Sequence, residues 1–145
     1  MSPPGVSVDL NYYRTLIAVA EDCPVRSAVV PEGRGGRRTV AVVQYEMLAG
    51  RPYVYTQEDV LFESWVRRQD MPDISEERRA ALRDEFFSRS QACLRASPLP
   101  KQYGWGLAFD AEGRVALCPM ESGEYAALLE DEGTTVLKAM RSRRT

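Results

Sequence analysis

The stretch Tyr103-Gly-Trp-Gly-Leu-Ala-Phe-Asp-Ala-Glu-Gly-Arg-Val-Ala-Leu-Cys-Pro119 decides the fold. Bulky and small residues alternate on either side of Asp110–Gly113, as in strands that have one bulky and one small face. The segment Asp110–Gly113 is typical of a turn, because it ends in a glycine that readily adopts a positive φ. The stretch therefore predicts an antiparallel β-hairpin over residues 103–119.

Segments far from the hairpin in the sequence predict further extended structure. Tyr12–Ala20 is apolar on both faces, which indicates an inner strand or a strand with two covered faces. Thr134–Met140 predicts the last strand. Arg26–Val30 is expected to be a second, short extended piece before Pro31.

The segment Val40–Ala49 fits two interpretations. Its β-branched residues favour a strand, whereas the spacing of its apolar residues fits a helix. Thr39 can act as an N-cap, and the pair Gly50 and Pro52 is typical of a helix end. We expect a helix here.

Three more helices are expected, each after a side chain that can cap it. Thr56 precedes a turn rich in acids and amides, which the helix dipole favours at this end. Ser75 begins a helix that ends near Arg89, and Ser122 begins a short helix that ends at Gly133. The apolar stripe of the helix after Thr56 consists of Leu61, Phe62, Trp65 and Val66.

The order strand, helices, hairpin, helix, strand predicts an α+β fold. We expect a small, mainly antiparallel sheet of about four strands with about three to four helices packed on it. The chain has 145 residues, which fits one domain. We expect residues 1–10 to be a disordered N-terminal end, residues 11–141 to form a single domain, and residues 142–145 to be a basic tail.

The charges are nearly balanced, with 19 lysines and arginines against 21 acids and a net charge of −2. This balance gives no general attraction to nucleic acid or to an anionic membrane. The basic C-terminal end, from Lys138 to Arg144, has no stacking aromatic residues in its tail, so nucleic-acid binding is not favoured. No apolar run approaches the roughly 18 residues of a membrane helix.

The chain has three cysteines and no histidine. Cys23, Cys93 and Cys118 are widely spaced, and the first ten residues lack the pattern of a secretory signal, so we expect reduced thiols in the cytoplasm. The missing histidine removes the commonest general base and the commonest zinc ligand. We therefore expect no metal site and no cofactor.

Several motifs together resemble a family of small microbial proteins of unassigned function. The resemblance extends from about Asn11 to Arg144 and implies a single-domain cytoplasmic protein, but it carries over no functional residue. The motifs are Asn11-Tyr-Tyr, Ala20-Glu-Asp-Cys-Pro24, Gln44-Tyr-Glu-Met-Leu48, Tyr53-Val-Tyr-Thr-Gln-Glu-Asp-Val-Leu-Phe62, Ser97-Pro-Leu-Pro-Lys-Gln-Tyr-Gly-Trp-Gly106 and Lys138-Ala-Met-Arg-Ser-Arg143.

The segment that leads into the hairpin is the main candidate for a binding site. Arginine can grip a carboxylate or phosphate with two hydrogen bonds, and Pro98 and Pro100 restrict the backbone around it. The glycines of the first hairpin strand leave one face of the sheet bare, so that a ligand can approach. The candidate ligand-binding residues are Tyr45, Arg95, Ser97, Lys101, Gly104, Trp105 and Gly106. The competing interpretation is a structured loop with surface cations and aromatic core residues.

The candidate catalytic residues are Cys93, Lys101, Tyr103 and Glu46. A nucleophilic Cys93 needs a thiolate, which nearby cations favour, but the chain has no histidine to act as its base. Glu46 lies in an otherwise apolar stretch, where a carboxyl group can act as a general acid or base. The competing interpretations are a thiol buried as a small hydrophobic group and carboxylates on exposed helix faces.

A weaker candidate is the basic loop Gly33–Thr39, whose backbone N–H groups could hold a phosphate. It lacks the spacing of a nucleotide-binding phosphate loop, and a solvated basic loop is the preferred interpretation.

Two functions follow from these patterns. The first is binding of a small anionic or polar molecule, with or without catalysis, in a pocket between the Cys93–Lys101 loop and the Tyr103–Phe109 strand. The alternative is a non-catalytic interaction protein, such as a homodimer or an accessory subunit, that acts through an aromatic and apolar interface.

Overall fold

The structure is a computed structural model that describes residues 9–33, 39–69 and 73–142. Three of the expectations above fall wholly or partly outside these residues. They concern the disordered end (residues 1–8), the basic loop (residues 34–38) and the basic tail (residues 143–145).

The fold is α+β, with a five-stranded mixed sheet in the order β2-β4-β3-β1-β5. All neighbouring strands are antiparallel except β1 and β5, which are parallel. The strands are β1 (Thr15–Ala18), β2 (Tyr55–Thr56), β3 (Trp105–Phe109), β4 (Arg114–Pro119) and β5 (Thr135–Lys138). The helices are α1 (Val40–Leu48), α2 (Gln57–Arg68), α3 (Glu76–Phe87), the 3₁₀ helix η1 (Leu94–Ala96), α4 (Pro98–Gln102) and α5 (Gly123–Glu130).

The predicted hairpin is confirmed as β3 and β4, with Leu107 opposite Leu117. Gly113 ends the turn with a φ of +82°, and a Cβ atom there would meet the Tyr13 ring at 2.9 Å. Strand β1 is an inner strand, as its apolar pattern predicted, and all four of its residues are buried. The expectation of about four strands missed β2, which has only two residues.

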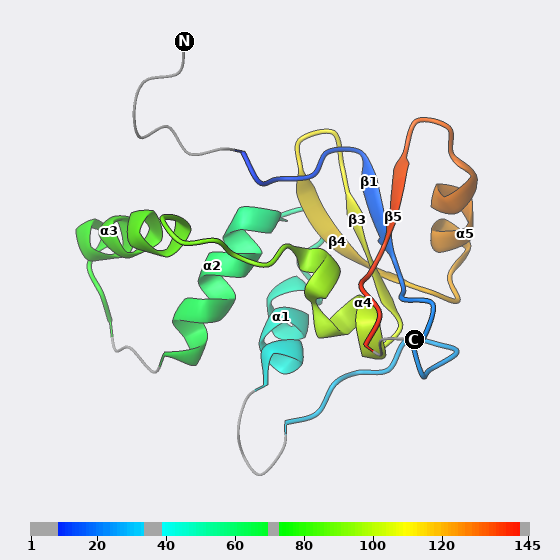
Figure 1. The fold of residues 1–145 in the computed structure, drawn as a ribbon, viewed down its shortest axis with the longest axis horizontal. Helices are drawn as coiled ribbons and strands as arrows, with labels where there is room; N and C mark the ends of the chain where they lie inside the picture. Colours follow the sequence, from blue (N-terminus) through cyan, green and yellow to red (C-terminus); the bar gives the residue numbers. More distant parts are fainter. Residues whose placement is uncertain (1–8, 34–38, 70–72, 143–145) are drawn as a thin grey trace.

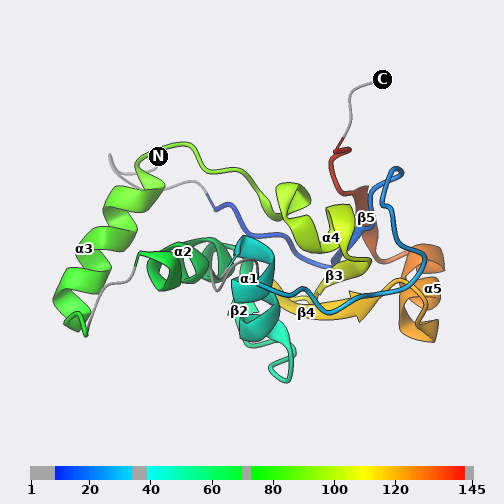
Figure 2. The ribbon, with the colours of Figure 1, turned by 90° about the horizontal axis from the view of Figure 1, so that it is seen from below.

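Helices cover both faces of the sheet (Figures 1 and 2). On one face, Ile17 and Leu107 pack in a core cluster with Val43 and Met47 of α1 and Leu99 of α4. On the other face, the buried residues Leu16, Ala18, Ala108 and Cys118 pack against Tyr125 of α5. This two-sided burial explains why β1 has no polar face.

The predicted N-caps account for four helix starts. The side chains of Thr39, Thr56, Ser75 and Ser122 each accept a hydrogen bond from a backbone N–H in the first turn of α1, α2, α3 and α5. Thr56 and Asp59 form a reciprocal capping box. The ambiguous segment after Thr39 is a helix, so its caps outweigh the strand preference of its β-branched residues.

Helices α2 and α3 form an arm at one side of the molecule (Figures 1 and 2). A third cluster joins them, with Phe62, Val66 and Leu82 buried and the side chains of Trp65 and Phe86 packed against it. Leu82 is the only residue of α3 that is buried. Helix α3 is therefore held by a smaller apolar contact than α1, which has four buried apolar residues.

Two expected segments differ from the structure. Residues 93–101 are not an open loop, because η1 and α4 occupy them and Pro98 begins α4, where its missing N–H costs nothing. Arg26–Val30 forms no strand; it is an irregular connection that donates the Val29 N–H to the Tyr103 carbonyl at 2.9 Å.

Candidate functional site

The hollow expected beside Gly104 and Gly106, at the start of β3, is filled by protein. A Cβ atom at Gly106 would lie 2.8 Å from a ring carbon of Tyr125, and one at Gly104 would lie 2.9 Å from the Ser27 carbonyl oxygen. The bare patch therefore accommodates α5 and the segment before Val29 instead of a ligand. This corrects the expected location of the pocket, because the small residues serve the packing of the sheet.

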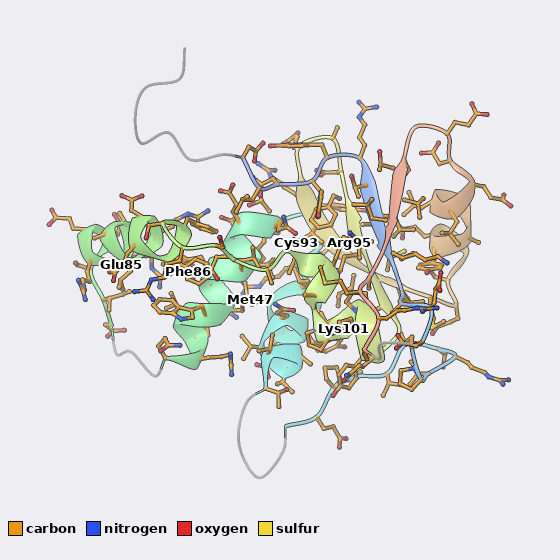
Figure 3. All side chains as sticks on the ribbon, viewed as in Figure 1. Met47, Glu85, Phe86, Cys93, Arg95 and Lys101 are labelled. Carbon is orange, nitrogen blue, oxygen red and sulfur yellow. The ribbon has the colours of Figure 1, made fainter. Side chains whose placement is uncertain are left out.

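Arg95 closes the edge of the sheet. Its Nε donates to the Lys138 carbonyl at 2.8 Å, and its own carbonyl accepts from the Met140 N–H at 2.8 Å. Figure 3 shows Arg95 beside β5 and Lys101 farther along the η1–α4 segment. Arg95 and Lys101, which were expected to bind one anion together, thus do not meet beside Gly104 and Gly106. Arg95 instead joins η1 to the end of the chain after β5 and to β5 itself through these two hydrogen bonds.

The remaining predicted residues are divided between the core and the surface. Trp105 packs its ring 5.4 Å from that of Tyr45 and donates its Nε1–H to the Val29 carbonyl at 2.8 Å. Tyr103 is half-buried against the main core, which agrees with the competing interpretation of the aromatics. Glu46 is exposed on α1, and Lys101 is half-buried on α4.

Two of the predicted residues, Cys93 and Ser97, line the same hollow. This hollow, the Cys93 groove, has a volume of about 370 Å³ and lies between α1, α2 and the segment that follows α3. It is lined by Val40 and Gln44 of α1, Leu61, Ser64, Trp65 and Arg68 of α2, Phe86 of α3, and residues 91–94 and 96–98. Its aromatic wall is the pair Trp65 and Phe86, whose ring centroids lie 5.4 Å apart.

Gln44 supplies a buried polar group to the groove. The residue is only 4% exposed, and its Oε1 accepts a hydrogen bond of 2.6 Å from the Ser97 hydroxyl. The Ser97 oxygen in turn accepts from the Leu99 N–H at 3.2 Å. The amide nitrogen of Gln44 donates to no residue that the structure describes. No buried side-chain nitrogen or oxygen of the described residues lacks a partner, so this nitrogen lies open to the groove, where a bound molecule can accept its hydrogen bond.

The thiol of Cys93 lies next to the hydroxyl of Tyr12. Burial and a side-chain hydrogen bond with Cys93 raise the pKa of Tyr12 to about 12. Tyr12 also packs edge-on against Phe109, with ring centroids 5.5 Å apart. Cys118 is fully buried, and this burial raises the pKa of its thiol. Of the three thiols, Cys93 is the one that borders the groove.

The charge in the groove is positive. Arg68 is the one charged side chain among the lining residues, and it forms no ion pair with another described residue. Val40 begins α1, so the groove also borders the N-terminal end of a nine-residue helix. The backbone N–H groups at that end carry partial positive charge.

Sequence reasoning missed the α1 and α2 residues of this groove. Gln44 follows Val40 by one helical turn, and Leu61, Ser64, Trp65 and Arg68 have the spacing of one helix face. The signal for them was the pair of polar residues, Gln44 and Ser64, within apolar helix faces. Whether these two helix faces lie side by side depends on how α1 packs on α2, which the spacing alone does not show.

Other kinds of site find no support in the described part of the chain. No group of three or more cysteine, aspartate or glutamate side chains there is arranged to hold a metal ion. None of its helices combines the length and the apolar character needed to cross a bilayer.

The sequence model of one protein family matches residues 7–145, and its description is "Family of unknown function (DUF6157)". The chain belongs to this family. The match confirms the resemblance that the motifs indicated and covers nearly the whole chain. No curated protein and no solved structure shows significant similarity to it. The DUF6157 family therefore supplies a membership but no activity.

Proposed function

We propose that this member of the DUF6157 family binds a small polar or anionic molecule in the Cys93 groove. The observation that carries the proposal is the Gln44 amide, which is buried at the groove and whose nitrogen has no described partner. This nitrogen is open to the groove, since no side-chain nitrogen or oxygen that is buried in the described residues lacks a partner, so an acceptor atom of a ligand can bind it in place of water.

The composition of the groove supports the same function. Ligand sites are mostly apolar hollows of roughly 300–1,000 Å³ with a few placed polar groups. The Cys93 groove has apolar walls from α2 and α3 and polar groups from Gln44, Ser64 and Ser97. Its volume of about 370 Å³ suits a molecule of small-metabolite size.

We propose binding in this groove. Any reaction there would depend on Cys93, the catalytic candidate that lines it. Lys101, Tyr103 and Glu46 do not line the groove, so the other three catalytic candidates lie outside it. Cys93 has Tyr12 beside it, but the chain contains no histidine to act as its base. All three cysteines are free thiols, which fits the reducing cytoplasm that we propose as the location.

A matched pair of variants tests the site. Ala92 is exposed and lines the groove, whereas Ala127 is exposed on α5, away from it. A set of small acids, amides and alcohols is titrated while amide NMR signals are followed. We expect shifts in residues 40–44, 61–68 and 91–98 that the Ala92→Trp variant loses and the Ala127→Trp variant keeps. If no compound moves these signals, or if both variants bind alike, the proposal is wrong.

A second candidate function is an interaction protein, for instance a homodimer. It is favoured by exposed apolar residues: Tyr53 lines a hollow with Leu128 of α5, and Val54, which follows Tyr53 in the chain, is 53% exposed. Such a patch is typical of an interface when it is large and continuous. Sedimentation of the wild type and of a Val54→Lys variant tests it. Self-association that the variant abolishes would support it, and a wild type that stays monomeric at high concentration would exclude the homodimer.

A further inference from the structure

The hydrogen-bonding inventory of the Cys93 groove indicates which ligands it accepts. Several of the side-chain hydrogens at its surface are already used. The Ser97 hydroxyl donates to Gln44, the Ser64 hydroxyl donates to the Leu61 carbonyl at 3.2 Å, and the Gln91 amide donates to the Phe86 carbonyl at 2.8 Å. The side-chain donors of the groove that keep a hydrogen without a described partner include the Gln44 amide nitrogen, the Trp65 indole N–H and the Arg68 guanidinium. A ligand that matches them must bring acceptor atoms.

The sign of the charge narrows the choice further. No aspartate or glutamate is among the described residues that line the groove, and Arg68 is its one charged side chain. The N-terminal end of α1 adds partial positive charge from Val40 onward. Hydrogen bonds between charged partners are about twice as strong as neutral ones, so Arg68 favours an anionic ligand over a neutral one. A carboxylate, with two acceptor oxygens and one negative charge, fits an amide and a guanidinium together.

The walls indicate what the carboxylate is attached to. Trp65 and Phe86 present two tilted rings, and Leu61 continues the apolar surface along α2. Aromatic rings pack well against one another in offset or tilted arrangements. A body without an aromatic ring would fill the volume but would lose this contact.

We infer that the Cys93 groove binds an aromatic carboxylate, with Gln44 and Arg68 recognising the carboxylate and Trp65 and Phe86 contacting the ring. The inference rests on the proposed function, since it names the ligand class of the same groove. It assigns to Arg68 the recognition of an anion that the sequence had suggested for Arg95.

A compound series tests the class. The probes are 2-naphthoate, its neutral amide, the corresponding naphthylmethylamine, acetate and adamantane-1-carboxylate, each titrated into the full chain at low salt. We expect 2-naphthoate to bind best, with the amide weaker by about tenfold because it loses the charge-assisted hydrogen bonds. Acetate and adamantane-1-carboxylate should also bind more weakly, because they lack the ring.

Two arginines provide a matched pair of variants. Arg67 and Arg68 are both exposed at the end of α2, but only Arg68 lines the groove. We expect Arg68→Gln to weaken 2-naphthoate by about three- to tenfold and to leave the amide unchanged. Arg67→Gln should change neither by more than about twofold. In addition, Gln44→Glu keeps an acceptor for the Ser97 hydroxyl but repels the carboxylate, so it should weaken 2-naphthoate further.

The outcomes separate this inference from the proposed function. If the amide binds as tightly as 2-naphthoate and Ala92→Trp abolishes both, the carboxylate class is wrong while binding in the groove stands. If Arg67→Gln and Arg68→Gln weaken 2-naphthoate equally, general surface charge explains the preference, and the assigned recognition by Arg68 is wrong. If Ala92→Trp leaves 2-naphthoate binding intact, both the class and the site are wrong.

Discussion

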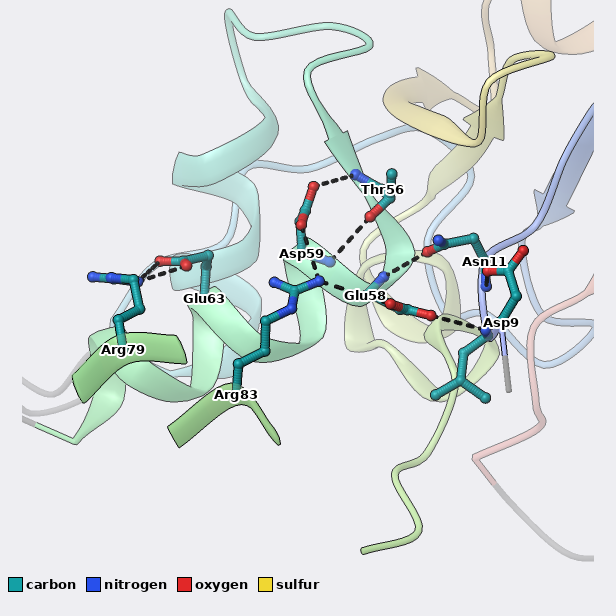
Figure 4. A network of polar contacts seen from close by, with 9 residues as sticks. Asp9, Asn11, Thr56, Glu58, Asp59, Glu63, Arg79 and Arg83 are labelled. Carbon is teal, nitrogen blue, oxygen red and sulfur yellow. Dashed lines mark hydrogen bonds and ion pairs between the residues drawn. The ribbon is translucent and has the colours of Figure 1, made fainter. Parts of the chain in front are cut away.

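The sheet and the helical arm are held together by different forces. Around the sheet, Ile17, Val43 and Leu99 are completely buried, and hydrogen-bonded strands run through the cluster. In the arm, α3 contributes one buried residue, Leu82. Its other attachments are rings at the edge of the cluster and ion pairs with α2 (Figure 4).

The ion pairs of the arm join α3 to α2 at two places. Arg79 contacts Glu63 at 2.6 Å, and Arg83 contacts Asp59 at 3.2 Å and Glu58 at 3.7 Å. These side chains are 21–40% exposed, so solvent screens them in part. Glu58 also accepts from the Leu10 N–H at 2.9 Å, which links the arm to the segment before β1.

The Cys93 groove has one wall from the sheet region and one from the arm, so the difference in burial between these two regions affects it. Val40 and Gln44 belong to a helix packed on the sheet, whereas Phe86 belongs to α3. Segments with few buried contacts open at lower free energy than the core. The Gln44 amide is thus on the rigid side, whereas Arg68 and the aromatic wall of the groove belong to the arm, and Phe86 lies on its less buried helix.

The largest effect is expected in the sheet. Leu107 is 1% exposed and lies on β3, which pairs with strands on both sides. Leu107→Ala should lower the free energy of unfolding by about 3 kcal/mol, from lost burial and the cavity that remains. Leu82→Ala should cost roughly half as much, since α3 is peripheral. Urea denaturation measures both, and equal losses would contradict the division into two regions.

The next effect comes from close packing on the α5 side of the sheet. Gly106→Ala places a methyl group 2.8 Å from the Tyr125 ring and 3.1 Å from the Cys118 carbonyl oxygen. Overpacking of this kind costs about 1–3 kcal/mol. The control is Gly123→Ala at the start of α5, where a Cβ meets no atom within 4 Å. This control should be neutral or slightly stabilising; an equally neutral Gly106→Ala in thermal unfolding would show that the tight contact does not exist.

The local structure around these residues was predictable from the sequence. The alternation from Tyr103 to Pro119 defines the hairpin, and a threonine or serine marks the start of each of the four capped helices. Both signals depend on residues close together in the chain, where the spacing of side chains is fixed by the backbone. In the same way, the cap Thr39 and the helix end at Gly50, which has a φ of +77°, predicted that the β-branched segment between them is a helix.

The site was less predictable, because its residues meet only through packing. The glycines of β3 indicated a close approach correctly, but the sequence did not show that Tyr125 is what approaches Gly106. Arg95 was a plausible anion ligand until its partner, the Lys138 carbonyl, was known. Gln44 and Arg68 lie on different helices, and their common groove depends on the docking of α1 on α2.

A smaller effect is expected at the contact between Tyr12 and Cys93. Burial and the hydrogen bond raise the pKa of Tyr12 to about 12, above the value of about 10 for an unfolded chain. The neutral hydroxyl therefore stabilises the fold below pH 10, and this contribution is lost as the pH rises from 10 to 12. Because Tyr12 is only partly buried, we expect a loss of about 1 kcal/mol.

Two variants isolate this contact. Tyr12→Phe should flatten the fall in stability above pH 10, and Cys93→Ala should lower the pKa of Tyr12 toward 10. Ultraviolet absorbance of the tyrosinates and alkaline unfolding measure the two effects. If Cys93→Ala leaves every tyrosine titration unchanged, the thiol does not interact with the Tyr12 hydroxyl.

The smallest effect tests the arm itself. Raising the salt from about 0.01 M to about 1 M shortens the Debye length from about 30 Å to about 3 Å, which weakens exposed ion pairs. Hydrogen exchange of the α3 amides should accelerate by about twofold, while β1 and β3 stay unchanged, because their contacts are apolar.

Arg83→Gln should remove much of the salt effect. Arg78 is exposed, and the structure shows no ion pair between it and another described residue. Arg78→Gln should therefore leave the salt effect unchanged. An equal response of α3 and β3 to salt would mean that the arm and the sheet unfold as one unit. The aromatic wall of the Cys93 groove would then be as rigid as the helix that carries Gln44.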